Sequence, residues 1–324
     1  MIKSKPSLTA AGLLALLCAA PAHASNSKSW VSNSGSDANA CSLAQPCATF
    51  QRAHDQTAAG GEIGVLTPGD YGGIGIPRVS VTKSISITND GSGEATILGS
   101  IGIEIAAGVG DIADLRGLVI DGGGTTSGGA GIIFSSGAAV HVLNCAIRNF
   151  NSAGSGGRGV FFAPTGNSQL FISDSVIFNN GNFANSGGIE IAPQGSGTAR
   201  LVLDRVHVDD NVFGIKANGA AGSSIRVTVR DSVVSGNVSH GIQVLAGPGK
   251  AFLAIEGSLV VNNAGTGILA DGSGAAVLLG DSTIFRNGAG VSTINGGQLL
   301  SYGNNRNNVN VGAEGVATGS LAQF

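Results

Sequence analysis

Gly188-Ile189-Glu190-Ile191, Gly214-Ile215-Lys216-Ala217 and Gly241-Ile242-Gln243-Val244 are copies of one short unit. In each copy a glycine precedes two apolar residues that flank a polar one. Nine glycines followed by a branched apolar residue recur through the chain, 23 to 29 residues apart, at Gly73, Gly102, Gly131, Gly159, Gly188, Gly214, Gly241, Gly267 and Gly290. A near-constant spacing with small insertions is typical of stacked repeats.

A second element recurs with the same period as the first and reads Asp-Ser-x-apolar-x-x-Asn. Full copies span 174–180, 231–237 and 281–287, and degenerate copies span 144–150 and 257–263. Stacked units would place Asn180, Asn237, Asn263 and Asn287 above one another at a turn, where asparagine tolerates left-handed backbone and can bond to its copies. The strands would then be parallel and in register, about 4.8 Å apart.

Two other architectures fit this repeat poorly. Helices are disfavoured because the apolar residues alternate and 54 of 324 residues are glycine. The units are too short for the four strands of a propeller blade. We therefore predict an all-β fold, a right-handed single-stranded parallel β-helix of about nine coils over residues 62–324. Because stacked repeats share a continuous core, residues 25–324 should form one structural domain.

The first 24 residues resemble a secretion signal, with Lys3 and Lys5 ahead of a short apolar run and Ala22-His23-Ala24 as the cleavage site. A lipid-attached alternative would use Cys18, but Leu17 before it is bulky for that motif. We expect a secreted or periplasmic, monomeric protein that does not span a membrane. The formal charge of the whole chain is −3, so losing two lysines leaves about −5. Without a basic run, nucleic acid is excluded as a partner.

Residues 25–61 differ in kind from the repeats and should cap the open end of the stack. Thr49 can cap a short helix that carries Phe50 and Ala53 on one face, with His54 facing solvent and Gly60-Gly61 ending it. In an exported protein, Cys41 and Cys47 predict a local disulfide. Cys145 lies in a strand pattern and is expected to be a small buried residue.

The opening of the cap resembles a known family. Trp30-Val31-Ser32, Gly35-Ser36-Asp37, Thr49-Phe50, Gly60-Gly61-Glu62-Ile63 and Pro68-Gly69-Asp70-Tyr71 are similar to the start of secreted proteins of the pectin-lyase-like β-helix superfamily. Tyr302-Gly303-Asn304-Asn305-Arg306 resembles their last coil. The resemblance covers nearly all of residues 25–324. It implies the fold and a polysaccharide-related role, but this scaffold carries lyases, hydrolases, epimerases and inert adhesins.

The second position after each repeat glycine should face outward. That row reads Glu104, Ile133, Phe161, Glu190, Lys216, Gln243, Leu269 and Ser292. Its middle predicts a sugar-binding stripe, with Phe161 as a stacking platform and Glu190, Lys216 and Gln243 bonding hydroxyls or a carboxylate. The alternative is an exposed Glu–Lys pair between strands that only helps register.

In one coil the sequence differs from the second element and reads Asp204-Arg205-Val206-His207-Val208-Asp209-Asp210. Either the strand shifts by one residue, so that Val206 and Val208 face inward and Asn211 takes the turn, or an ionisable cluster lies at the coil edge. Oxygen ligands from Asp204, Asp209 and Asp210 could hold Ca²⁺ for an acidic substrate. Alternatively, the last two could act as an acid and base pair in glycoside hydrolysis, or the segment is a bulged turn with solvated carboxylates.

The family patterns test these catalytic hypotheses. Polygalacturonases carry Asn-Thr-Asp, Asp-Asp, His-Gly and Arg-Ile-Lys in order. Here Asp209-Asp210 and His240-Gly241 are too far apart, Thr88-Asn89-Asp90 is not the first motif, and no Arg-Ile-Lys follows. A lyase on a uronate polymer would need a base, for which Lys216 or Arg205 is a candidate, with His207 nearby in sequence.

Three functional classes therefore stay open. The chain could be a polysaccharide lyase or glycoside hydrolase, a module that binds a polysaccharide or cell-surface glycan, or an adhesive or structural surface protein.

Overall fold

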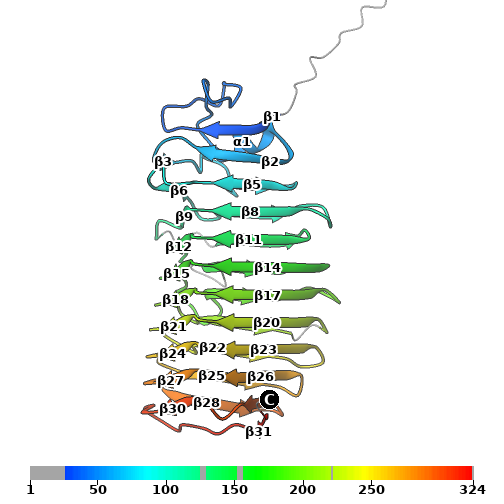
Figure 1. The fold of residues 1–324 in the computed structure, drawn as a ribbon, viewed down its shortest axis with the longest axis vertical. Helices are drawn as coiled ribbons and strands as arrows, with labels where there is room; N and C mark the ends of the chain where they lie inside the picture. Colours follow the sequence, from blue (N-terminus) through cyan, green and yellow to red (C-terminus); the bar gives the residue numbers. More distant parts are fainter. Residues whose placement is uncertain (1–25, 125–128, 152–155, 220–221, 323–324) are drawn as a thin grey trace, which may run out of the picture.

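The computed structural model describes residues 26–124, 129–151, 156–219 and 222–322. The predicted signal segment, residues 1–24, lies outside them. Within the described residues, the chain winds as a column of stacked coils (Figure 1), and each complete coil passes through three parallel sheets, A, then B, then C. This confirms the predicted parallel β-helix of about nine coils. No helix in the described ranges is long and apolar enough to cross a membrane.

Sheet A is the widest, with twelve strands in the described part of the chain. They are β1 (Asn26–Val31), β2 (Thr57–Val65), β5 (Ile85–Thr88), β8 (Ile112–Arg116), β11 (Ala139–Leu143), β14 (Asn167–Ser173), β17 (Thr198–Asp204), β20 (Ser224–Arg230), β23 (Lys250–Glu256), β26 (Ala275–Gly280), β29 (Gln298–Ser301) and β31 (Gly319–Ser320).

Sheet B has ten short strands in the same described ranges. They are β3 (Gly69–Asp70), β6 (Ala95–Leu98), β9 (Leu118–Asp121), β12 (Ala146–Arg148), β15 (Val176–Phe178), β18 (His207–Asp209), β21 (Val233–Ser235), β24 (Leu259–Val261), β27 (Thr283–Phe285) and β30 (Arg306–Asn308).

From Gly102 onward sheet C begins at the repeat glycines, and it has nine strands where the chain is described. They are β4 (Val79–Val81), β7 (Ile103–Ala106), β10 (Ala130–Ser136), β13 (Arg158–Phe162), β16 (Gly187–Ile191), β19 (Ile215–Asn218), β22 (Ile242–Leu245), β25 (Thr266–Asp271) and β28 (Ala289–Ile294). The prediction that Gly73-Ile74 forms the first unit was wrong, because these residues lie in the loop before β4 and Ile74 is exposed.

The recurring glycines are needed because successive coils approach closely where sheet C begins. A Cβ atom at Gly188 would lie 2.5 Å from the carbonyl oxygen of Gly214, and one at Gly214 would lie 2.4 Å from that of Gly241. Such distances are too short for any side chain, so each coil excludes a Cβ on the coil before it. The motif that identifies the fold is therefore a steric requirement of stacking.

Buried asparagines form a continuous ladder between sheets B and C. The Nδ2 of Asn180 donates to Oδ1 of Asn211 at 3.0 Å, and the Nδ2 of Asn237 donates to Oδ1 of Asn263 at 2.8 Å. The backbone N–H of Asn211 donates to Oδ1 of Asn237 at 3.0 Å, which joins the two halves. Asn287 continues the ladder. Each amide thus satisfies buried backbone and side-chain groups of the adjacent coil.

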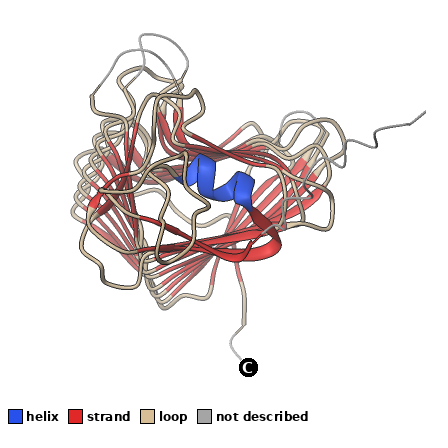
Figure 2. Cartoon of the chain, turned by 90° about the horizontal axis from the view of Figure 1, so that it is seen from above, coloured by secondary structure: helices blue, strands red, loops and turns tan. Residues whose placement is uncertain are grey.

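A cap covers the first coil, as Figure 2 shows for the helix seen along the column. Helix α1 (Phe50–Gln56) begins after Thr49, whose side chain accepts a hydrogen bond from the N–H of Arg52, and it buries Phe50 and Ala53 as predicted. It ends at Gln56, earlier than the expected stop at Gly60-Gly61. The reason is Thr57, which turns to extended backbone and donates its hydroxyl to the carbonyl of Ala53.

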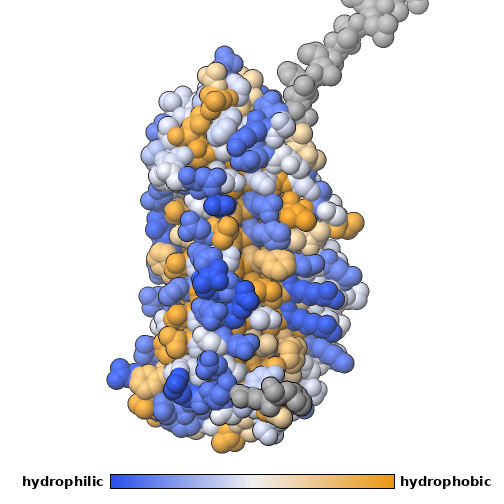
Figure 3. Space-filling view, viewed as in Figure 1, coloured by the Kyte–Doolittle hydropathy of each residue, from blue (hydrophilic) through white to orange (hydrophobic). Residues whose placement is uncertain are grey.

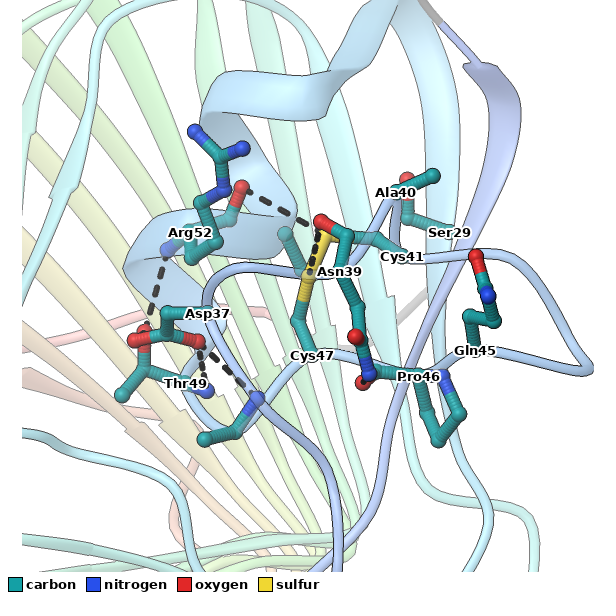
Figure 4. Close-up of a disulfide and its surroundings, with 12 residues drawn as sticks. Ser29, Asp37, Asn39, Ala40, Cys41, Gln45, Pro46, Cys47, Thr49 and Arg52 are labelled. Atoms are coloured by element: carbon teal, nitrogen blue, oxygen red, sulfur yellow. Dashed lines mark hydrogen bonds between the residues drawn. A yellow bond between two sulfur atoms is a disulfide. The ribbon is translucent and has the colours of Figure 1, made fainter.

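The predicted disulfide joins Cys41 to Cys47, with a Cα–Cα distance of 4.7 Å. Figure 4 shows the loop it closes beside helix α1, where Asp37 accepts hydrogen bonds from the backbone and hydroxyl of Thr49. Cys145 is the other cysteine in the described chain. It is buried as predicted, and burial raises the pKa of its thiol to about 11.

The expectation that His54 faces solvent was wrong. The residue is only 3% exposed, because the last turn of α1 presses onto the segment that follows β4, where the N–H of Thr82 points to Nε2 of His54. Burial lowers the pKa of this imidazole, and the neighbouring Asp55 carboxylate only partly offsets the effect. The neutral imidazole is thus favoured in the folded chain.

We predict that replacing Asn237 with alanine lowers the free energy of unfolding by about 2 kcal/mol, because the N–H of Asn211 loses its buried acceptor. Urea unfolding measures the change. Asn308→Ala, on the exposed end of β30, is the control and should shift stability by less than about 0.5 kcal/mol. An equal effect of both substitutions would contradict the ladder's role.

We also predict that stability falls as the pH drops below about 6.5, since the unfolded chain then takes up a proton that buried His54 resists. The contribution of His54 to the free energy of unfolding is fully present above that pH. It decreases as the pH falls toward the lowered pKa of the folded state. In His54→Gln the loss between neutral and mildly acidic pH should be smaller, though His240, whose pKa is also lowered by burial, keeps part of it. Identical pH profiles of urea midpoints would disprove this assignment.

Candidate functional site

The predicted outward row lies in register across sheet C. Phe161 on β13 pairs with Glu190 on β16, which pairs with Lys216 on β19, which pairs with Gln243 on β22. Ile189 and Ile191, on either side of Glu190, are fully buried in the core. The alternation of the repeat therefore assigned the two faces of this sheet correctly.

The two charged residues of this row are nearly buried, which corrects the expectation of an exposed polar stripe. Glu190 is 5% exposed and Lys216 is 9% exposed. Nε of Arg158, on β13, donates to Oε2 of Glu190, and Nζ of Lys216 lies 3.7 Å from Oε1 of the same carboxylate. We call Arg158, Glu190 and Lys216 the sheet C cluster.

Aromatic rings complete the surroundings of this cluster. The guanidinium of Arg158 lies over the ring of Phe161, 4.6 Å from its centroid, and Nζ of Lys216 lies 5.5 Å from the centroid of Phe213. Cations are attracted to ring faces. Phe161 was predicted as a free stacking platform, but Arg158 occupies one of its faces.

Burial and charge make this cluster unusual for the outside of a sheet. Lysine, glutamate and arginine are almost never buried unless they are paired, because leaving water costs each ion several kcal/mol. Here two cations share one carboxylate, so one positive charge is left over among the three. Such an arrangement favours an anionic group arriving from solvent.

The irregular coil adopts the shifted strand. Val206 and Val208 point into the core and Asn211 occupies the turn in the ladder, while Arg205 and His207 lie outside. Ser173 pairs with Asp204 and Phe178 with Asp209 without a bulge, so Arg205 takes the place of Asp174 and Asn211 that of Asn180. The coil therefore keeps the register of its neighbours, and only its residue types differ.

Asp204, a predicted calcium ligand, is held by arginines. Nε of Arg230 donates to its Oδ1 at 2.8 Å, and Arg205 donates to its Oδ2. Arg205 also binds both carboxylate oxygens of Asp174, at 2.7 and 2.8 Å. This contact lowers the pKa of Asp174 and raises that of Arg205.

The two remaining aspartates lie on and beside sheet B. Asp209 accepts a hydrogen bond from the hydroxyl of Ser235 at 2.6 Å, and Nδ1 of His207 lies 3.5 Å from its other oxygen. Asp210 is exposed in a left-handed turn with φ of 55°.

The structure does not bring the predicted catalytic residues together. Asp204 ends a strand of sheet A, His207 and Asp209 lie on sheet B, and Lys216 lies on sheet C, where its ion pair is with Glu190. In the described residues, no three histidine, cysteine or acidic side chains converge to hold a metal.

A groove on the outward face of sheet A was not predicted from the sequence. It is a hollow of about 490 Å³ that we call the sheet A groove, lined by Gln169, Phe171, Arg200, Leu201, Val202, Arg226, Val227, Thr228 and Phe252. The sequence signal is Ile225-Arg226-Val227-Thr228-Val229, where apolar residues alternate with polar ones, and the arginine before Leu201-Val202-Leu203.

Comparisons with known proteins fit this architecture. Residues 83–252, about half of the chain, match the family described as right handed beta helix region. The crystal structure of pectate lyase Pel9A superposes with a TM-score of 0.63 at 17% sequence identity, covering 91% of this chain and 78% of that one. A rhamnogalacturonan lyase gives a TM-score of 0.39 at 12% identity, covering 84% and 75%. No curated protein sequence matches.

At 17% identity the pectate lyase structure supports a shared fold and leaves the activity open. The family match rests on the repeat itself, since it spans the coils from β5 to β23. The chain belongs to the right-handed β-helix family and has a pectin-lyase-like fold.

Proposed function

We propose that this chain is a secreted protein that binds an extracellular polysaccharide along the outward face of sheet C. The observation that carries the proposal is the sheet C cluster, in which two cations and one carboxylate are nearly buried on the outside of a sheet. The surplus positive charge suits the carboxylate of a uronate. Phe161 and Gln243, next to the cluster in the same row, would contact the sugar rings and hydroxyls.

Two further features support the proposal. The signal-like first 24 residues and the Cys41–Cys47 disulfide fit export to an oxidising compartment. The solved structure most similar in shape among those described above is named a pectate lyase, and pectate is an acidic polysaccharide. Because one fold carries different chemistries, the test addresses the sheet C cluster directly.

We predict that Lys216→Met weakens binding to polygalacturonate about tenfold, because the cluster loses its surplus positive charge while Arg158 still pairs with Glu190. Isothermal titration calorimetry against acidic and neutral polysaccharides measures the change. Arg306→Gln removes one exposed cation from sheet B and is the matched control. Unchanged affinity of the lysine variant, with its fold intact by circular dichroism, would reject the sheet C site.

A catalytic form of this proposal would be a uronate-polymer lyase with Lys216 as base and His207 assisting. Asp204, Asp209 and Asp210 do not fit the calcium site that such a lyase implies, because Asp204 lies on sheet A and is bound by arginines, whereas Asp209 lies on sheet B and is bound by Ser235. If this form is right, ultraviolet absorbance of unsaturated product rises with polygalacturonate, with or without added calcium, and Lys216→Met abolishes the rise. Binding without product under either condition would make the protein a binding module.

A further inference from the structure

A pocket lies beside the cap, and none of its lining residues belongs to sheet A, B or C. It is therefore separate from the sheet A face, which Figure 3 shows with apolar side chains along its middle and hydrophilic ones on both sides. We call it the cap pocket. Its volume is about 370 Å³, which is within the range of small-molecule sites. It is lined by Asp37, Thr49, Gln51, Gly72, Gly73, Ile74, Gly75, Pro77 and Arg78.

The loop that forms one side of the pocket, residues 72–78, is fixed to helix α1 on both sides. Before the loop, the carbonyl oxygen of Tyr71 accepts a hydrogen bond from the N–H of Phe50 at 3.0 Å. After it, the N–H of Ser80 donates to Oε1 of Gln51 at 2.6 Å. The pocket is thus formed in the chain without a ligand, and binding would not have to order the loop.

Arg78 supplies a guanidinium group whose position is fixed by two contacts. Its side chain lies over Gly99, where a Cβ atom would come within 2.7 Å of Cγ and 2.9 Å of Cδ of the arginine. Its Nη1 donates to the carbonyl oxygen of Gly73 at 2.7 Å, and its Nε is buried without a hydrogen-bond partner. Among the described residues, no carboxylate lies within ion-pair distance of this group. A fixed guanidinium with unused donors favours a carboxylate ligand.

The acidic residue of the lining is already engaged. Asp37 accepts hydrogen bonds from the N–H of Ala48 at 2.9 Å and from the N–H and hydroxyl of Thr49 at 3.0 and 2.9 Å, beside the beginning of α1 (Figure 4). By contrast, the backbone N–H groups of residues 73–75 have no acceptor within the described part of the chain. Neighbouring N–H groups in a turn attract anions. The donors of this pocket are therefore free, whereas its carboxylate is not.

Apolar side chains lie beside these donors. Ile74 lines the pocket and is 98% exposed, and Ile76, two residues further along the loop, is 71% exposed. Isoleucine is among the residues most often buried, so two of them exposed in one short loop are unusual. A ligand that covers them would remove apolar surface from water.

We propose that the cap pocket binds a small carboxylate that carries a short apolar chain. The carboxylate would accept hydrogen bonds from Arg78 and from the N–H groups of residues 73–75, and the apolar chain would pack against Ile74 and Ile76. The ligand would touch both the cap and the loop before β4, and it would therefore stabilise their contact. This site goes beyond the proposed function, because it lies outside the sheets and takes a different class of ligand.

The test compares octanoate with octanamide, which has the same chain without the charge, and with acetate, which has the charge without the chain. Isothermal titration calorimetry on the full chain should show octanoate binding about tenfold or more tightly than either, because it alone uses both halves of the pocket. Its affinity should fall as salt is raised. Octanoate should also raise the melting temperature, whereas octanamide and acetate should change it less.

Two substitutions address the guanidinium in different ways. Arg78→Gln should weaken binding of octanoate about tenfold and remove the preference over octanamide. Gly99→Ala should have a similar effect while the charge is kept, because the new Cβ displaces the side chain of Arg78. Gly110→Ala is its matched control, since a Cβ there meets no atom within 4 Å. Arg306→Gln, which removes an exposed cation from sheet B, is the control for the arginine. Both controls should leave affinity unchanged.

Equal binding of octanoate and octanamide would overturn the proposal, and so would unchanged affinity in both Arg78→Gln and Gly99→Ala. Sedimentation of the protein with phosphatidylglycerol vesicles, without binding of free octanoate, would also overturn it and would assign the loop to a lipid surface. Lys216→Met should bind octanoate as the parent chain does. The cap pocket and the sheet C site can therefore fail separately.

Discussion

The close approach of successive coils where sheet C begins is the constraint on which this structure depends. No side chain fits there, because the carbonyl oxygen of the next repeat glycine lies only 2.5 Å from where a Cβ of Gly188 would be and 2.4 Å from where one of Gly214 would be. The asparagine ladder beside it holds the same distance by hydrogen bonds that join coil to coil. Together they fix the register of all three sheets, because a shift in one would break contacts in the others.

Fixed register turns the outside of the column into rows of side chains. Inward positions must be apolar to fill the core, whereas an outward position is constrained only by the residue above and below it. A row can therefore bring Arg200 and Arg226 into a repulsive pair, or place Lys216 beside Glu190, without disturbing the core. The scaffold can tolerate chemistry that a compact globular core would reject, and this explains why unrelated functions use one fold.

The repeat predicted the fold well because it records contacts that each coil imposes on the next. The glycines, the asparagines and the alternation around Glu190 all have that origin, and even the shifted strand at Val206 and Val208 could be anticipated. Burial of Glu190 and Lys216 could not, because it depends on Arg158 at the start of β13 and on Phe213 in the turn before β19, and the repeat specifies neither side chain. The position of His54 likewise depends on how the cap meets the first coil.

The same distinction explains why the irregular coil was an uncertain guide to function. A departure from a repeat indicates either chemistry or a local structural adjustment, and the sequence alone leaves both open. Here Asn211 restores the ladder and Arg205 and Arg230 neutralise Asp204, so the departure is satisfied within the fold. In this chain a departure from the repeat is therefore explained by contacts within the fold, and it does not by itself indicate a ligand.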